Sequence, residues 1–307
     1  MPIEPHSIQV EASSRCQLGC PACPTATGAA RPVLGTGDLQ IDNFEALLNR
    51  NPTLAGVELS NYGEMFLNPR LIDILRCAFE HNVVLHADNG VHLNDASGEV
   101  LEALVKYRFR SITCSIDGAS AETYAQYRRN GNFDQVIANI REINRCKRAH
   151  HSGFPILRWQ FIVFGHNEHE IAAARRLAGE LEMSFYTKLP WSGDVSPVRN
   201  PELVRIQSGA PHATGDEYLK TTGLHYMRST CYQMWRAPVV NWDGKMLGCS
   251  RNFWGDFGAN VFNDGLGASV NSDRMNHGRQ MLFGHAPARP DIPCTTCELF
   301  HTLRDTG

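Results

Sequence analysis

The feature that most constrains the fold is an alternation of short apolar runs with helix-like segments over the first two-thirds of the chain. Six runs have the length and β-branched content of buried strands: Ser7–Ala12, Ala55–Ser60, Val83–Asn89, Arg110–Ile116, Ile156–Phe164 and Met183–Leu189. Helix-like segments lie near Phe44–Arg50, Pro69–His81, Ser97–Tyr107, Ala121–Ala149 and Glu168–Glu182. Strand–helix alternation predicts an α/β fold with a parallel sheet and helices outside it. In such a fold the reactive groups are expected at the carboxyl ends of the strands.

The pattern changes after the sixth run. From Pro190 to about Tyr226 the residues Pro, Gly, Ser and His are scattered and periodicity is lost, which predicts a linker or substrate loop. The last eighty or so residues show little helical periodicity. We therefore expect two domains, residues 1–225 with the linker and residues 226–307.

Composition narrows the functional class. The 307 residues carry a formal net charge of −3, so neither a nucleic-acid footprint nor a membrane-surface patch is indicated. The N-terminus lacks a signal-peptide pattern, and no apolar run reaches membrane-spanning length. We expect a cytoplasmic protein with no nucleic-acid or membrane partner. Ten Cys in that reducing compartment indicate metal binding rather than disulfides.

Three cysteines follow the first predicted strand. Cys16, Cys20 and Cys23 form a C-x3-C-x2-C triad. A closed zinc site usually takes four ligands, so three thiolates in one loop fit a four-iron cluster with one free iron. Half of a zinc site is the alternative.

Four more cysteines form a second group. Cys231, Cys249, Cys294 and Cys297 have the pattern C-x17-C … C-x2-C. The segment Asn241–Gly244 predicts a hairpin turn that brings Cys231 and Cys249 to one centre. An auxiliary iron–sulfur cluster and a four-Cys zinc ribbon both fit this spacing. Cys77, Cys114 and Cys146 remain, and we expect them to be buried structural residues.

The two cysteine groups together resemble the radical S-adenosylmethionine (SAM) superfamily with a SPASM/twitch module. The resemblance implies a partial (β/α)6 TIM-like barrel, a twitch/SPASM-like C-terminal domain, two [4Fe–4S] clusters and SAM. In that family the free iron chelates SAM, and electron transfer releases a 5′-deoxyadenosyl radical. The cofactors carry this chemistry and the protein positions them. A flavodoxin- or ferredoxin-type electron donor is the implied partner.

Further strings resemble the family's SAM-binding segments. Gly63 and Glu64 occupy Gly-Glu positions that contact the SAM amino group in the family, although Tyr62 replaces the first Gly of that motif. Ser115 and Asp117 end the fourth run and alternate onto one face. The family places this Ser near SAM.

Two more cofactor-binding residues follow from the same resemblance. Arg128 matches an Arg that pairs with the SAM carboxylate, a role suited to a bidentate guanidinium. Val163 lies in Gln160–Glu170, which resembles a segment that flanks adenine in the family. Ala22 departs from the aromatic residue often found before the third triad Cys.

The overall size and the C-terminal strings resemble aminoglycoside-pathway members, with a neomycin-type epimerase preferred. An epimerase returns a hydrogen atom from a thiol, and Cys249 is the candidate, although its spacing also makes it a cluster ligand. Two alternatives are kept: a dehydrogenase that oxidises an aminocyclitol or aminosugar alcohol through the auxiliary cluster, and a peptide-modifying enzyme. A cationic aminosugar substrate needs acids, and the candidates are Glu58, Asp88, Asp194, Asp243 and Asp256.

Overall fold

Eight strands form one sheet in the computed structural model, which describes residues 2–190 and 195–305, with side chains as far as residue 302. The strands are β1 (Ser7–Val10), β2 (Gly56–Glu58), β3 (Val84–Val91), β4 (Ser111–Ser115), β5 (Ile156–Ile162), β6 (Ser184–Lys188), β7 (Val239–Val240) and β8 (Met246–Gly248). Their spatial order is β6-β5-β4-β3-β2-β1-β7-β8. The pairs from β1 to β6 are parallel. Because β1 and β6 lie apart in this order, the barrel is open, which confirms the predicted partial α/β barrel.

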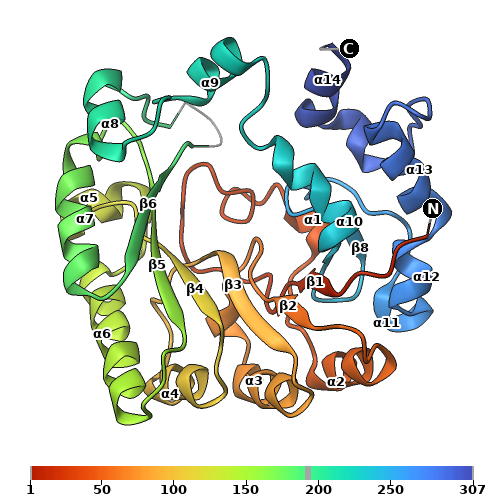
Figure 1. Ribbon diagram of the computed structural model, residues 1–307, viewed down its shortest axis with the longest axis horizontal. Coiled ribbons are helices and arrows are strands. Elements are labelled where there is room, and N and C mark those ends of the chain that lie inside the picture. Colours follow the sequence, from red (N-terminus) through yellow and green to blue (C-terminus); the bar gives the residue numbers. More distant parts are fainter. Residues whose placement is uncertain (1, 191–194, 306–307) are drawn as a thin grey trace.

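The six predicted strands all form. Five lie within the expected ranges, and β3 alone runs on, ending at Val91 rather than Asn89. The helices are α1 (Arg31–Leu34), α2 (Ile41–Arg50), α3 (Leu71–Glu80), α4 (Gly98–Lys106), α5 (Ala121–Tyr127), α6 (Phe133–Ala149), α7 (Ile171–Glu180), α8 (Pro201–Ser208), α9 (Gly215–Thr222), α10 (Gln233–Arg236), α11 (Val261–Asp264), α12 (Leu266–Val270), α13 (Asp273–Leu282) and α14 (Glu298–Asp305). Helices α2–α4, α6 and α7 lie along the outer side of the sheet (Figure 1). The core fills the space between them, and Val57, Ile112 and Trp159 are fully buried there.

The single helix expected over Ala121–Ala149 is two helices. Arg128 ends α5, and Asn130 has a left-handed φ of 65°. Asn132 then caps α6 by accepting a hydrogen bond from the backbone N–H of Gln135. A capping Asn after Gly is a helix-start signal that outweighs the continuous periodicity.

The region expected as an irregular linker contains helices. Asn200 caps α8 with Pro at the first helical turn, and Thr214 caps α9. Gly209 and Gly223 end these helices in the left-handed conformation. The last eighty residues, expected to show little helix, contain α10 to α14. Short helices of this kind are set by their caps rather than by a long apolar stripe.

The hairpin predicted at Asn241–Gly244 forms between β7 and β8. Gly244 has φ 91° and donates its N–H to the carbonyl of Asn241 at 3.0 Å. Strand β7 pairs in parallel with β1, so the C-terminal part continues the barrel's sheet. Helices α11 to α14 lie beside this edge (Figure 1).

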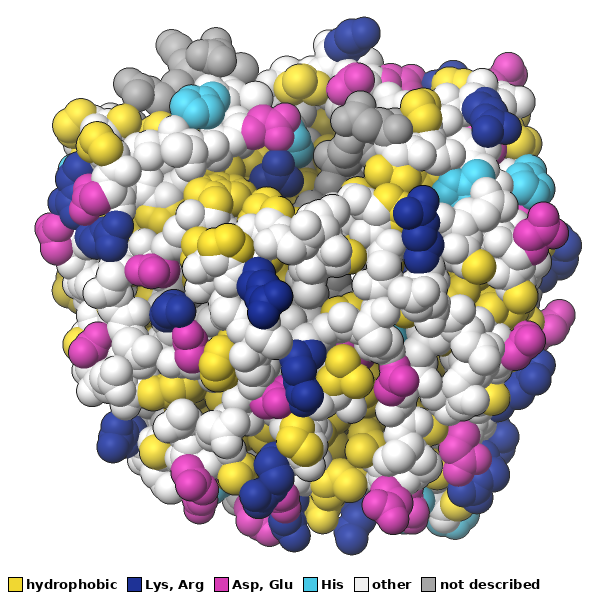
Figure 2. All heavy atoms as spheres, turned by 180° about the vertical axis from the view of Figure 1, so that it is seen from behind, with side chains coloured by type: hydrophobic (Ala, Val, Ile, Leu, Met, Phe, Trp, Pro, Cys, Tyr) yellow, Lys and Arg dark blue, Asp and Glu magenta, His cyan; other side chains and the backbone are white. Residues whose placement is uncertain are grey.

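The surface carries charges of both signs. Figure 2 shows Lys and Arg interspersed with Asp and Glu over one face of the molecule. In the part of the chain that the structure describes, no helix combines the length and apolar character needed to cross a membrane.

Candidate functional site

One cavity at the carboxyl ends of the strands gathers most of the predicted cofactor residues. It encloses about 960 Å³ of empty volume, including solvent at its mouth. All three triad cysteines line it, and so do these predicted residues: Gly63, Glu64, Ser115 and Arg128. They come from the loops after β1 and β2, from β4 and from the end of α5. The chain therefore brings together residues more than a hundred positions apart.

Only glycine fits at position 63, because the loop after β2 passes very close to the loop after β1 there. A Cβ built on Gly63 would lie 1.9 Å from the backbone oxygen of Ser13, which no side chain can accommodate. Its N–H donates to Oε1 of Glu11 at 2.6 Å. The next amide, that of Glu64, donates to the carbonyl of Arg15 at 2.7 Å. These contacts hold the Gly-Glu segment against the loop that carries the triad.

Glu64 is a buried carboxyl group facing the cavity. Its Oε2 accepts a hydrogen bond from the backbone N–H of His92 at 2.8 Å and lies 3.1 Å from Nε2 of the same residue. Burial lowers the pKa of His92 to about 3, so its ring is neutral. Burial raises the pKa of Glu64 to about 8. A ligand cation beside this carboxyl group would therefore stabilise its ionised form.

Arg128 is held by Asp117. Its Nε donates to Oδ2 of Asp117 at 2.6 Å, and Nη1 lies 3.8 Å from Sγ of Cys20. Although burial opposes the charge, the Asp117 carboxylate holds the pKa of Arg128 well above its usual value. Asp117 is fully buried, and its other oxygen accepts from the amide of Ile162 at 2.7 Å. Asp117 therefore positions Arg128 and does not itself line the cavity.

Val163 lies outside the lining of this cavity. Its neighbours Ile162 and Phe164 line it, whereas Val163 borders a separate cavity near Leu189 and Val204. The adenine-flanking role predicted for this segment stays a prediction.

The second cysteine group surrounds its own cavity. Its empty volume is about 400 Å³, and Cys231, Cys249, Cys294 and Cys297 all line it. The other walls are largely apolar, with Met234, Leu247, Trp254, Phe257, Leu282, Pro293, Leu299 and Phe300. Burial raises the pKa of Cys231 to about 12 and that of Cys249 to about 11. Metal binding here would have to displace thiol protons, because thiolates are the ligands.

The cysteine sulfurs are not gathered as tightly as a bound zinc ion would hold them. A tetrahedral zinc ion with Zn–S bonds of about 2.3 Å holds its sulfurs about 3.8 Å apart. Among the described residues, no three cysteine sulfurs lie within 4.8 Å of one another.

Tyr62 lies between the two cavities. It lines the first, and its O–H donates to the backbone carbonyl of Arg251, two residues after Cys249, at 2.7 Å. Burial raises the pKa of Tyr62, and repulsion from Cys249 adds to this rise. The Cys249 sulfur therefore lies within electrostatic reach of a residue in the first cavity's wall.

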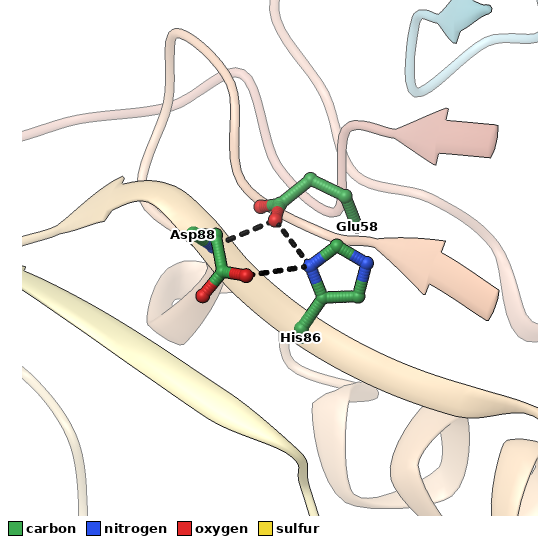
Figure 3. A group of neighbouring side chains, drawn as sticks. All are labelled: Glu58, His86 and Asp88. Carbon is green, nitrogen blue, oxygen red and sulfur yellow. Dashed lines mark hydrogen bonds and ion pairs between the residues drawn. The ribbon is translucent and has the colours of Figure 1, made fainter. Parts of the chain in front are cut away.

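Two of the predicted acids form a charge-balanced group with a histidine. Figure 3 shows Glu58 from β2 and the side chains of His86 and Asp88 from β3 converging. Nδ1 of His86 lies 2.8 Å from Oε2 of Glu58 and 3.3 Å from Oδ2 of Asp88. Arg158 adds a second cation, 2.8 Å from the other oxygen of Asp88.

A proton suits this group better than a metal ion. Burial alone would lower the pKa of His86, but hydrogen bonds to Asp88 and Glu58 raise it to about 9. At neutral pH the protonated ring therefore outnumbers the neutral ring about a hundredfold, and a metal ion would have to displace that proton to bind. Hydrogen bonds from His86 and Ser111 overcome the effect of burial and lower the pKa of Asp88 to about 2. These carboxylates are neutralised within the protein.

The remaining predicted acids either have partners within the protein or lie outside the described residues. Asp243 pairs with Lys245 at 2.9 Å, and Asp256 accepts from the amide of Gly258 at 2.6 Å. Asp194 lies outside the described residues. None of these acids lines the first cavity within the described part of the chain, where Glu64 is the only carboxylate in the lining.

Sequence reasoning missed five polar residues of the first cavity. They are Asn61, Asn89, His92, Gln160 and Lys188, and each lies in or just after a strand. Burial lowers the pKa of Lys188. Their position at the carboxyl ends of strands could have indicated a place in the site. No motif, however, distinguishes these polar residues from other polar residues near strand ends.

The structure is similar to proteins solved with SAM. Streptococcus suis SuiB bound to S-adenosylmethionine superposes with a TM-score of 0.66 and 14% identity over 96% of this chain and 71% of SuiB. BtrN in complex with AdoMet and 2-DOIA gives a TM-score of 0.53 and 15% identity over 97% of this chain and 92% of BtrN. The chain has their fold.

Sequence comparison gives one partial match. An AdoMet-dependent heme synthase of Methanosarcina barkeri (strain Fusaro / DSM 804) is 27% identical over 145 residues, which are 46% of this chain. The match spans only 40% of that relative. No known family model matches the sequence.

Proposed function

We propose that this chain is a radical SAM enzyme. The observation that carries the proposal is the single cavity lined by Cys16, Cys20, Cys23, Glu64 and Arg128. The triad would hold a [4Fe–4S] cluster with one iron open to SAM. When bound, the cluster and SAM supply a 5′-deoxyadenosyl radical that removes a hydrogen atom from a substrate carbon.

The protein's own part at this site is to hold the two ends of the SAM methionine group. The buried Glu64 carboxylate suits the ammonium, because a cation there relieves the cost of ionising it. Arg128 uses Nε for Asp117 and directs Nη1 toward Sγ of Cys20, so the outer side of its guanidinium remains for the SAM carboxylate. Ser115 lines the same cavity beside Gly90.

We expect SAM binding to weaken in Glu64→Gln and in Arg128→Lys. The first removes the negative charge, and the second keeps the charge but loses both the planar fork and the bond to Asp117. Each change should raise the Kd for SAM about tenfold or more, as measured by equilibrium dialysis on the reconstituted enzyme. Arg129→Lys is the matched control, since Arg129 does not line the cavity. Unchanged affinity in both variants would show that these two residues do not hold SAM.

The four-cysteine cavity supports a second [4Fe–4S] cluster. All four cysteines line this one cavity, and its other walls are largely apolar, which suits a cluster held by four thiolates. We assign residues 226–307 to a twitch/SPASM-like domain that holds it. A cytoplasmic electron donor of the flavodoxin or ferredoxin type would supply the electrons.

For the reaction we favour epimerisation of a sugar carbon in an aminoglycoside. The thiol of Cys249 would return a hydrogen atom to the substrate radical from the side of the second cavity. The loop that carries Cys249 lies next to the first cavity, because the O–H of the cavity-lining Tyr62 donates to the carbonyl of Arg251, two residues after Cys249, and this proximity supports the role. The resulting sulfur radical needs one electron and one proton to become a thiol again, which the electron donor and solvent supply. Cys231, Cys294 and Cys297 would then remain as cluster ligands.

Two other reactions have specific support. Dehydrogenation of an aminocyclitol or aminosugar alcohol is favoured by the four-Cys cavity, in which Cys249 serves as a ligand, and by the full-length likeness to BtrN with 2-DOIA bound. Peptide modification is favoured by the likeness to SuiB, which was solved with the precursor peptide SuiA.

The mass of the product distinguishes epimerisation from dehydrogenation, and the SAM consumed tests the radical step that both reactions share. The reconstituted enzyme should convert a candidate aminoglycoside, with SAM and reductant, to a product of unchanged mass. About one SAM should be consumed per product molecule, because the abstracted hydrogen stays on 5′-deoxyadenosine. Liquid chromatography with mass spectrometry measures both quantities. A product lighter by two hydrogens would favour dehydrogenation instead.

A further inference from the structure

Three carboxamide side chains line the first cavity and have no part in the proposed SAM contacts. They are Asn61 after β2, Asn89 in β3 and Gln160 in β5. Gln160 is fixed on both sides, because its Oε1 accepts from the hydroxyl of Tyr186 at 3.0 Å and its Nε2 donates to Ser115 at 3.3 Å. A carboxamide offers both a donor and an acceptor without charge.

The orientation of Asn61 is set by two donors. Nε2 of Gln9 donates to Oδ1 of Asn61 at 3.3 Å, and Nδ2 of Asn89 donates to the same oxygen at 3.5 Å. Gln9 is itself anchored by a 2.6 Å bond to the carbonyl of Ser60. Because both neighbours donate, the atom they meet must be the oxygen of the amide.

The nitrogen of Asn61 is left without a partner. Nδ2 is buried and makes no hydrogen bond to any described residue. A buried donor left unsatisfied destabilises the folded state. Since Asn61 lines the cavity, a small shift of its side chain would bring Nδ2 to an acceptor atom of a ligand there and relieve that cost.

A relay of amides connects Asn61 with the loop that carries Cys249. Oε1 of the buried Gln9 accepts from Nε2 of Gln233 at 3.1 Å. Oε1 of Gln233 accepts from the backbone N–H of Ser250, the residue after Cys249, at 2.7 Å. Every link has a defined direction, so the relay fixes both Asn61 and its distance from this loop.

We infer that Nδ2 of Asn61 anchors a hydroxyl oxygen of a polyhydroxylated ring substrate, and that the Gln9–Gln233 relay positions this anchor relative to Cys249. The inference rests on the proposed function and names how its substrate is recognised. A protonated amine of the substrate has no lone pair to offer this donor. The anchor therefore reads a hydroxyl or ring oxygen, and the neutral amide lining suits such groups.

The test measures substrate binding without turnover. The reconstituted enzyme with SAM and no reductant is titrated calorimetrically with neomycin-class aminoglycosides and with aminocyclitols. Asn61→Leu has nearly the same shape, adds no charge that would attract a cationic aminosugar, and removes the donor, so it should raise the substrate Kd about tenfold. The Kd for SAM and the iron content should not change. Asn263→Leu, at an exposed amide on α11, is the control and should bind as the wild type does.

Each outcome decides the inference. An unchanged substrate Kd in Asn61→Leu overturns it, and so does a weaker SAM affinity with unchanged substrate affinity. If Asn61→Leu fails to fold, monodeoxy substrate analogues test the wild type instead: loss of one hydroxyl should raise Kd about tenfold, and an even response across the series overturns the anchor. If no ligand in the panel binds the wild type, the proposed function itself fails and the inference with it.

Discussion

Replacing Cys16, Cys20 and Cys23 together by Ala should remove about half of the iron from the reconstituted protein, from about eight to about four atoms per chain. The triad lies in its own cavity, so the four cysteines of the second cavity should keep their cluster. SAM cleavage should fall to background, because no other described cysteine lines the first cavity. Iron analysis and the yield of 5′-deoxyadenosine measure the two effects.

The matched control uses cysteines that line neither cavity. Cys77 and Cys146 are buried in α3 and α6, and Cys77→Ala with Cys146→Ala should keep full iron and full SAM cleavage. SAM cleavage that persisted in the triad variant would remove the basis of the radical SAM assignment. Loss of all iron would mean that the two sites do not assemble independently.

The second large effect is expected at Cys249. If its thiol donates hydrogen, Cys249→Ala should still form 5′-deoxyadenosine but release almost no epimer. The auxiliary iron should stay, because Cys231, Cys294 and Cys297 remain in the same cavity. If Cys249 is a ligand only, auxiliary iron and activity should fall together.

Ser250→Ala provides the neighbouring control. Ser250 contributes its backbone N–H to Gln233, and this contact survives removal of the hydroxyl. The variant should therefore behave like the wild type in iron content and product yield. A strong defect there would indicate that the loop as a whole, rather than the Cys249 thiol, is responsible.

The strands and the cysteine groups were predictable from the sequence for clear reasons. Buried parallel strands are nearly continuous apolar runs, so the six runs stood out. Thiols that share a cavity keep recognisable spacings, and all seven predicted cysteine ligands line one of the two cavities. Helices α8 and α9 were missed because they are eight residues each and depend on caps at Asn200 and Thr214.

The polar parts of the site were not predictable. Gln9 and Gln233 are 224 positions apart and meet only because β7 pairs with β1. Glu58 and Asp88 were expected to meet a cationic substrate, but His86 and Arg158 neutralise them. No local pattern distinguishes a buried polar residue that faces a cavity from one that is paired inside the protein.

The fate of the substrate radical is tested most directly by turnover in D2O. Exchangeable thiol hydrogen is replaced by deuterium there, so an epimerase product should gain one deuterium at the inverted carbon and otherwise match the substrate in mass. Mass spectrometry with NMR of the product locates the label. A product two hydrogens lighter than the substrate, with no solvent deuterium at that carbon, would contradict the epimerase account and favour the dehydrogenase.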